Sequence, residues 1–407
     1  MYRLFPDPAI ESQTAPTSHQ RLVARGFDAA YDKALNLGPE AVIHSIQAIR
    51  LGGRGGAAFP TARKWLSVKN EMEAIKYVVM NADESEPGTF KDRELLLRDP
   101  LAPLTGLLIA AHTVGAEKAY VYVRGEYRDV EMRILEAIQE LTATGWVGPE
   151  SVSIEVRRGA GAYIAGEETA LFNSIEGYRP EPRVKPPYPT AQGLFHKPTL
   201  IQNVETLANI ALLFAHDVDW FRAVGTAATP GTKLVALSGH VAHPGVYEVP
   251  FGIELGALIA DHQYGGGTGT SRPLKAVLMG GAAGTFLTPV EAMQARLDYV
   301  DLAKFGASVG SGAVMLFDYG TDLGRVLTGL ARFFADESCG QCVPCRIGTK
   351  RILEVLEGQR LWERRVDLAD LARAMTDASI CGLGQTAANA LVSAMNRPSL
   401  WEEPAAI

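Results

Sequence analysis

Apolar residues in the first half of the chain alternate between two spacings. Val42, Ile43, Ile46 and Ile49 recur at helical spacing within a helical segment over 21–50, for which Pro39 supplies a start. Short apolar runs have the length and β-branched content of buried strands, and they lie at 75–80, 119–123 and 153–156. Further helical spacing predicts helices over 103–114, 127–142, 168–175 and 203–214. Strands that alternate with helices predict an α/β fold with a mostly parallel sheet.

The pattern changes after residue 230. Strands are expected over 233–237, 245–249, 274–279 and 313–317, with one short helix over 255–262, which together predict a small α+β module of the β-grasp type. From Asp322 onward the chain shows only helical patterns. These changes predict four domains. Residues 1–64 are an N-terminal helical segment with a glycine-rich loop, 65–224 an α/β domain, 225–318 an α+β domain and 319–407 a helical domain.

Charge and apolar run length exclude several classes of protein. The 39 Lys and Arg against 46 Asp and Glu give a net charge of −7, which argues against broad nucleic-acid binding and a polybasic membrane anchor. Apolar runs stop short of the ~18–20 residues that a membrane-spanning helix needs. The N-terminus has no basic region followed by an apolar core, so we expect no secretion signal and a cytoplasmic location, with a peripheral place on a membrane complex left open.

The four cysteines suggest a metal centre. Cys339, Cys342 and Cys345 form C-x2-C-x2-C, and Cys381 follows after 35 residues. Four thiolates are the ligand set of a [4Fe–4S] cluster, and a compact triple with one distant partner suits it. A four-thiolate zinc site more often uses two separate C-x2-C pairs. We therefore predict an iron–sulfur cluster, with zinc and plain reduced thiols as the alternatives.

A glycine-rich segment suggests close contact with a flat or phosphorylated ligand. Residues 53–58 fit G-x-G-x-x-[GA], but a helical pattern precedes them where the dinucleotide fingerprint needs a strand. Glycines still let a backbone approach a ring or phosphate closely. Lys64 is then a candidate phosphate partner and Phe59 a candidate for stacking on a base. A glycine-rich surface turn is the alternative for this loop taken alone.

Two further polar segments follow predicted strands. Asn81, Asp83, Glu84 and Glu86 come just after the strand over 75–80, at the end where open α/β sheets bind ligands. Carboxylates there suit hydrogen bonds to ribitol, ribose or carboxamide, although a solvated acidic loop is the alternative. The segment over 159–169 joins a strand to a helix, and the helix dipole is a structural explanation for Glu168.

Six segments together resemble the NADH-binding flavoprotein subunit of respiratory complex I and the related diaphorase subunits of NAD-linked formate dehydrogenases and hydrogenases. They are 53–61 (GRGGAAFPT), 81–93 (NADESEPGTFKDR), 159–171 (GAGAYIAGEETAL), 203–206 (NVET), 337–346 (ESCGQCVPCR) and 381–384 (CGLG). The resemblance covers about residues 40–395. It implies an FMN-binding Rossmann-like domain, a ubiquitin-like (β-grasp) domain and a C-terminal helical bundle that carries one [4Fe–4S] cluster.

The resemblance also implies roles for single residues. It places the four cysteines on the cluster and NAD(H) over the exposed face of FMN, with Glu86 and Glu168 as the catalytic residues that orient it. Glu86 would also repel a 2′-phosphate and so favour NADH over NADPH. The cofactor-binding set that it implies is Gly53, Arg54, Gly55, Gly56, Phe59, Lys64, Asn81, Asp83, Glu84, Glu86, Tyr163, Gly166, Glu167, Glu168, Tyr188, Gln202 and Asn203.

The implied activity is that of an NADH:acceptor oxidoreductase. Hydride passes between NAD(H) and FMN, and single electrons pass between FMN and the cluster. Four cysteines hold one cluster, so the next carrier is expected on another chain, a thioredoxin-like [2Fe–2S] subunit of a larger redox complex. The sequence departs from the family at Ala58, Ser67, Ala165 and Gln202. Ala58 and Ser67 keep open the alternative of a module without turnover, and the cysteines keep open that of a zinc-bound structural protein.

Overall fold

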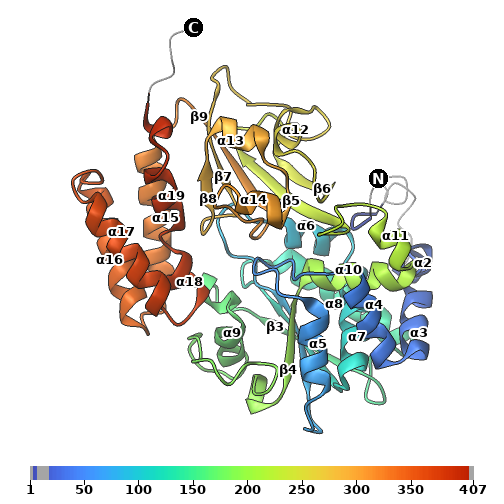
Figure 1. The fold of residues 1–407 in the computed structure, drawn as a ribbon. Helices are drawn as coiled ribbons and strands as arrows, with labels where there is room; N and C mark the ends of the chain where they lie inside the picture. The colour runs from blue at the N-terminus through green and yellow to red at the C-terminus, as the bar shows by residue number, and fades with distance from the viewer. Residues whose placement is uncertain (1–2, 7–17, 403–407) are drawn as a thin grey trace.

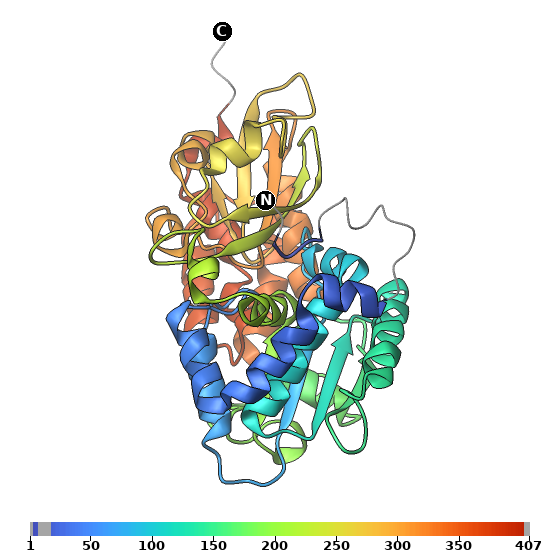
Figure 2. The same cartoon turned by 90° about the vertical axis from the view of Figure 1, so that its right-hand side faces the viewer.

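The computed structural model describes residues 3–6 and 18–402, and these residues form three parts (Figure 1). An α/β part comes first in the chain, a second sheet packs above it, and the C-terminal helices stand beside both. A view turned by 90° shows the second sheet stacked above the α/β part (Figure 2). The expectation about a secretion signal falls mostly on residues outside the described ones.

The first sheet is parallel throughout. Its order is β3-β2-β1-β4, from β1 (Tyr77–Ala82), β2 (Lys118–Val123), β3 (Ser153–Arg158) and β4 (Thr199–Asn203). The predicted parallel sheet is confirmed, but β4 was not predicted. The chain runs outward from β1 to β3 and then returns to the other side of β1. The strand order therefore reverses at the carboxyl ends of β1 and β4, which is where ligands bind in open α/β sheets, and we call this region the crevice.

The helices of this part largely follow the predicted pattern. They are α2 (Ser18–Ala24), α3 (Phe27–Leu37), α4 (Pro39–Ala48), α5 (Thr61–Lys69), α6 (Lys91–Arg98), α7 (Leu101–Val114), α8 (Arg128–Ala143), α9 (Glu168–Ile175), α10 (Val204–Ala215) and α11 (Val218–Arg222). The segment over 21–50 is three helices, because Gly26 and Gly38 take positive φ values of 68° and 77° between them. Helices α5, α6 and α11 were not predicted.

Helices α7 and α10 approach so closely that only glycine fits between them. A Cβ on Gly106 of α7 would lie 2.0 Å from the carbonyl oxygen of Leu207 in α10. Nearly all of α7 is buried, which explains why its apolar residues show no single face. Because Asn203 caps the start of α10, this contact also fixes one wall of the crevice.

The second sheet is mixed, with the order β6-β5-β9-β7-β8. Its strands are β5 (Thr232–Gly239), β6 (Gly245–Pro250), β7 (Leu274–Met279), β8 (Thr285–Leu287) and β9 (Ala313–Asp318), with helices α12 (Leu255–Ala260), α13 (Pro289–Gln294) and α14 (Tyr299–Ala303). Strands β5 and β9 pair in parallel and the other pairs are antiparallel. Val277 and Met279 lie in the core of this part, whereas Ala276 and Leu278 on the opposite face pack with the C-terminal helices.

Only helices follow Asp322 among the described residues, as predicted. They are α15 (Leu323–Glu337), α16 (Val343–Glu357), α17 (Arg365–Ala378), α18 (Gly382–Thr386) and α19 (Asn389–Met395), with a final 3₁₀ turn at Pro398–Trp401. Phe334, Ile352 and Met375 share a core with Phe286 of β8. No helix of the described chain has both the length and the apolar character needed to cross a membrane.

Gly106→Ala is expected to lower the free energy of unfolding by about 2 kcal/mol or more, because the new methyl group collides with backbone and forces α7 and α10 apart. Gly329→Ala is the matched control. Gly329 lies inside α15 with nothing within 4 Å of its Cβ position, so alanine there is expected to stabilise by up to about 1 kcal/mol. Urea unfolding of both variants measures this, and equal effects would contradict it.

Candidate functional site

Two asparagines mark the crevice at the strand ends. Asn81 of β1 and Asn203 of β4 are partners in register. The Asn81 side-chain amide donates to the carbonyl oxygen of Gly166 (2.8 Å). The Asn203 side chain accepts from the amide of Glu205 and donates to Asp92 (2.6 Å). The strand ends are thus tied to the starts of α6 and α10 and to the 3₁₀ turn at Tyr163–Gly166.

The glycine-rich loop closes one side of this crevice. It connects α4 to α5, so a helix precedes it as predicted, and Gly52 and Pro60 form a bridge at its base. A Cβ on Gly55 would lie 3.1 Å from Cβ of Asn203, so the loop backbone lies directly against the end of β4. Ala58 takes a φ of 52°, which explains why a glycine suits this position better.

Polar atoms in this region lack partners among the described residues. Asp83 Oδ2, just after β1, and Gln202 Nε2, near the end of β4, are buried with no hydrogen bond. Burial raises the pKa of Asp83 to about 7, against the lowering effect of its hydrogen bond from Ser85. Buried polar atoms in native proteins nearly always have partners. A glycine-lined crevice with a free acceptor and a free donor therefore fits a polar, planar cofactor such as FMN.

A buried group of charges lies beneath the loop. Glu205 of α10 contacts Lys91 of α6 at 2.9 Å and Lys233 of β5 at 2.6 Å, and all three side chains are almost fully buried. Burial would raise the pKa of Glu205, but the charges of Lys233, Lys91 and Arg54 outweigh it and lower the pKa to about 2. The ionised carboxylate thereby joins the α/β part to the second sheet.

Arg54 belongs to this buried layer. Its backbone amide donates to Thr206 Oγ1 (2.8 Å), and its guanidinium lies 4.4 Å from the ring centre of Phe251. Two nitrogens of this buried guanidinium have no hydrogen-bond partner among the described residues. Arg54 therefore fixes the loop from the inside of the protein.

Glu84 and Glu86 both bond to backbone. The Glu84 carboxylate accepts from the amides of Asp92 and Arg93 at the start of α6 (2.9 and 3.0 Å). Burial, followed by the charge of Asp92, raises the pKa of Glu84 to about 7. Glu86 accepts from the amide of Ala283, in the loop between β7 and β8 (3.0 Å), and burial raises its pKa also. Both carboxylates thus help to position neighbouring elements, which the sequence pattern alone did not indicate.

A second charged cluster lies at the start of α9. Glu168 contacts Lys64 at 3.0 Å and Lys185 at 2.6 Å, and Lys185 also contacts Glu167 at 3.0 Å. Burial would raise the pKa of Glu168, but the two lysines lower it to about 2. Glu167 itself caps α9. Lys185 is a residue that sequence reasoning missed, although it stands among the prolines of the irregular segment over 178–189.

The three aromatic candidates have different surroundings. Phe59 and Tyr188 are exposed, at 46% and 60% of their surface, as expected of rings available to stack on a base. Tyr163 instead joins two parts of the protein. Its backbone amide donates to Glu337 at the end of α15 (2.7 Å), and its ring centre lies 5.2 Å from that of Phe333.

The cysteines lie at the starts of two helices and in the loop before one of them. Cys342 and Cys381 precede the first residues of α16 and α18, Cys345 lies in the first turn of α16, and Cys339 lies in the loop before it. Burial raises the pKa of Cys345 and raises that of Cys381 to about 11. A Cβ on Gly384 would lie 2.8 Å from Cβ of Cys345, so α16 and α18 meet at this point.

This arrangement of thiols fits an iron–sulfur cluster. Among the described residues, no three His, Cys, Asp or Glu side chains converge tightly enough to hold one metal ion. A cubane does not require such convergence, because each of its four irons takes one thiolate. Bound iron would also supply the positive charge that ionises buried thiols.

Comparisons with known proteins agree with this geometry. Residues 46–212 match the Nuo51 FMN-binding domain, and residues 325–398 match the iron–sulfur binding region of NADH-ubiquinone oxidoreductase F. The chain is 40% identical over 367 residues to the F 2 subunit of the NADH-quinone oxidoreductase of Rhizobium meliloti (strain 1021), covering 88% of this chain and 86% of that protein.

Hydrogenase subunits are similar as well. The alpha subunit of an NAD-reducing hydrogenase from Cupriavidus necator is 37% identical over 383 residues, covering 91% of this chain and 62% of that protein. A crystal structure of an NAD⁺-reducing [NiFe]-hydrogenase matches with a TM-score of 0.84 at 36% identity, covering 98% of this chain and 66% of the hydrogenase chain. With its fold, its crevice and its four thiols, the chain belongs to the family of NADH-quinone oxidoreductase F subunits and the diaphorase-type subunits of NAD-reducing hydrogenases.

Proposed function

We propose that this chain is the NAD(H)-reacting module of a larger redox complex, with FMN in the crevice and a [4Fe–4S] cluster on Cys339, Cys342, Cys345 and Cys381. The observation that carries the proposal is the pair of unpartnered buried atoms, Asp83 Oδ2 and Gln202 Nε2, in a glycine-lined crevice where the strand order of a parallel sheet reverses.

The domain boundaries proposed are those expected from the sequence. Residues 1–64 form the helical segment and glycine-rich loop, 65–224 the FMN- and NADH-binding domain, 225–318 a ubiquitin-like domain and 319–407 a helical bundle with the cluster. Support for the third domain comes from its mixed sheet, in which β5 and β9 pair in parallel at the centre. Support for the fourth comes from the shared core of α15, α16 and α17.

When bound, FMN supplies the chemistry that accepts a hydride as two electrons and releases the electrons singly, and the cluster carries single electrons. The chain itself orients the reactants. Gly53, Gly55 and Gly56 let the loop backbone approach a flat ring, while Asn81, Asp83, Gln202 and Asn203 hold hydrogen-bonding groups at the strand ends. Proton transfer by a side chain is not required for hydride transfer, so Glu86 and Glu168 act in orientation and electrostatics.

The nucleotide is held by the cluster of Lys64, Glu168 and Lys185. The two ammonium groups suit the pyrophosphate, and an ionised Glu168 suits the ribose hydroxyls. The same negative charge disfavours a 2′-phosphate, so Glu168 contributes to a preference for NADH. Phe59 and Tyr188 have the exposed ring surface needed to flank the adenine.

The partner proposed is a thioredoxin-like [2Fe–2S] subunit within that larger complex. The chain has four cysteines, and one cubane uses all of them, so any further cluster belongs to another chain. None of the four cysteines forms a disulfide, and cysteines kept available as thiolate ligands suit a reducing compartment, which supports a cytoplasmic location.

Cys381→Ser is expected to reduce bound iron below four atoms per chain and to change the low-temperature EPR spectrum of the reduced protein, because serine is a poor ligand for this cluster. Val343→Ala alters the same region without removing a thiol and should keep full iron content. Iron and acid-labile sulfide assays on the purified protein measure both. Full cluster content in the serine variant would refute the assignment of Cys381.

Glu168→Gln is expected to raise kcat/KM for NADPH relative to NADH by about tenfold or more, because it removes the carboxylate that contacts both Lys64 and Lys185. Glu181→Gln is the matched control, since Glu181 pairs with Arg179 in the neighbouring loop and does not contact either lysine. Steady-state rates with ferricyanide as acceptor give the ratio. An unchanged ratio in Glu168→Gln would remove this residue from nucleotide selection.

Asp83→Asn is expected to change how the stability of the flavin-free chain depends on pH. With its pKa raised to about 7, folded Asp83 keeps a proton that the unfolded chain loses above about pH 4, so its contribution to stability falls as the pH rises through 7. Between pH 5 and pH 8 the wild type should therefore lose about 2.5 kcal/mol relative to the variant.

Urea unfolding at both pH values tests this. Asp370→Asn controls for the loss of a surface charge, because Asp370 is an exposed residue of α17. Parallel pH dependence of the wild type and Asp83→Asn would show that Asp83 is ionised normally.

A further inference from the structure

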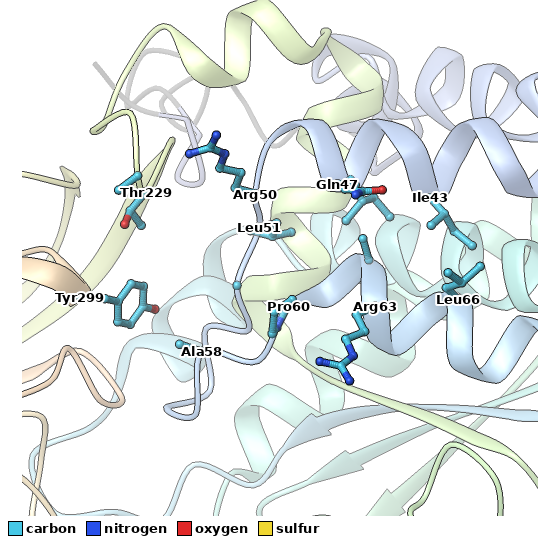
Figure 3. A pocket seen from close by; sticks show the side chains of 14 residues that line it. Ile43, Gln47, Arg50, Leu51, Ala58, Pro60, Arg63, Leu66, Thr229 and Tyr299 are labelled. Carbon is cyan, nitrogen blue, oxygen red and sulfur yellow. The ribbon is translucent and has the colours of Figure 1, made fainter.

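A cavity of about 580 Å³ lies behind the glycine-rich loop, outside the crevice (Figure 3). Its walls are the facing sides of α4 and α5, the loop backbone at Gly52 and Ala58, and Thr229 and Tyr299 from the neighbouring parts of the chain. We call it the α4–α5 pocket. None of its fourteen lining residues belongs to the set assigned to FMN, NAD(H) or the cluster. Its volume lies within the range of roughly 300–1,000 Å³ that is usual for sites of small molecules.

The lining is apolar between two cationic rims. Ile43, Ile46 and Leu66 supply the apolar wall. Arg50 and Arg63 lie on opposite sides of it, on the α4 side and on α5 (Figure 3). No lining residue is Asp or Glu, although the whole chain carries a net charge of −7. The positive character is therefore a local feature of this pocket.

Neither guanidinium is neutralised by a carboxylate among the described residues. One nitrogen of Arg50 donates to the carbonyl oxygen of Ala227 (3.1 Å), and Arg63 lies 5.9 Å from the ring centre of Phe59. Two exposed guanidinium groups beside apolar surface match an anionic headgroup on an apolar body. Gln47 and Tyr299 add polar atoms to the same lining.

The pocket is also connected to the flavin loop. Gly52 and Ala58 line the pocket, and the same two residues lie at the two ends of that loop. Ala58 has a positive φ of 52°. The Tyr299 ring packs on Phe251 with centres 5.6 Å apart, and Phe251 in turn contacts the Arg54 guanidinium. An occupant would press on the loop directly and through this pair of rings.

We propose that the α4–α5 pocket is a regulatory site for a small organic anion with an apolar body, of the class of medium-chain carboxylates, and that its occupation slows the loss of FMN. The effect on FMN rests on the proposed function, whereas binding of the anion does not. An anion whose carboxylate binds at a cationic rim and whose apolar chain lies along the wall between the rims would brace the loop from behind and restrict the opening that FMN release requires.

Decanoate is a suitable probe, titrated calorimetrically into the full-length FMN-loaded chain and into the complex that contains it. We expect saturable binding that Arg50→Gln/Arg63→Gln weakens at least tenfold and that Ala62→Trp abolishes by filling the cavity. Arg325→Gln is the control, because Arg325 is an exposed arginine of α15 outside the pocket. Release of FMN, followed by its fluorescence after dilution, should slow at least threefold with saturating decanoate in the wild type and remain unchanged in Ala62→Trp.

Several results would overturn the proposal. They are the absence of saturable binding, binding that the pocket variants leave unchanged, binding that does not alter FMN release, and binding to the isolated chain that disappears in the complex. The last result would mean that a partner subunit covers the pocket. A chain that binds decanoate but never retains FMN would instead refute the proposed function.

Discussion

The ionised carboxylate of Glu205 is the interaction on which the rest of this structure depends. It is fully buried and holds Lys91 and Lys233, so the starts of α6 and α10 and the first strand of the second sheet meet at one carboxylate. A buried charge is costly unless it is paired, and removing one partner of such a pair typically costs about 3–5 kcal/mol. The three elements are therefore held in one arrangement. That arrangement sets the positions of Asn203, Thr206 and, through Thr206, the glycine-rich loop.

The crevice follows from this arrangement. Neighbouring polar groups are satisfied by the protein itself, since Glu84 caps α6, Glu86 bonds the loop of the second sheet and Asn203 caps α10. At the strand ends, Asp83 Oδ2 and Gln202 Nε2 have no partner among the described residues, and in the glycine-rich loop the same holds for two nitrogens of Arg54. Because the surrounding scaffold is already bonded, a cofactor need not reorganise the site in order to bind. Preorganisation of this kind is what a module that passes electrons at a fixed geometry requires.

Two direct bonds link the nucleotide side to the cysteine side. Glu337 accepts from the amide of Tyr163, and Arg179 donates to the carbonyl oxygen of Cys339 (2.8 Å). Tyr163 and Arg179 lie on the nucleotide side, whereas Glu337 and Cys339 lie on the cysteine side. Each bond therefore fixes one proposed cofactor site relative to the other. Electron transfer between two centres needs such a fixed separation, and the aromatic contact of Tyr163 with Phe333 stiffens the same junction.

The sequence by itself determined the succession of elements and the chemistry of the ligands. Periodicity located β1, β2, β7 and β9 and most long helices, because local apolar spacing reports which face of an element is buried. The cysteine spacing predicted an iron–sulfur cluster for the same local reason, whereas FMN and NAD(H) were implied by the resemblance of six segments to a known family. Short elements whose residues alternate weakly, such as β4 and α6, were missed, and β4 supplies Asn203.

Only the tertiary structure decided which distant groups meet. Glu168 contacts Lys64, which is 104 residues away in the sequence, and also contacts Lys185. Glu205 pairs with one lysine from the α/β part and one from the second sheet. Glu86 lies against the second sheet rather than in a solvated loop. No local pattern encodes these pairings, because burial and the positions of whole elements create them. The sequence thus determined what this protein binds by class, whereas packing decided which charges hold the binding sites in place.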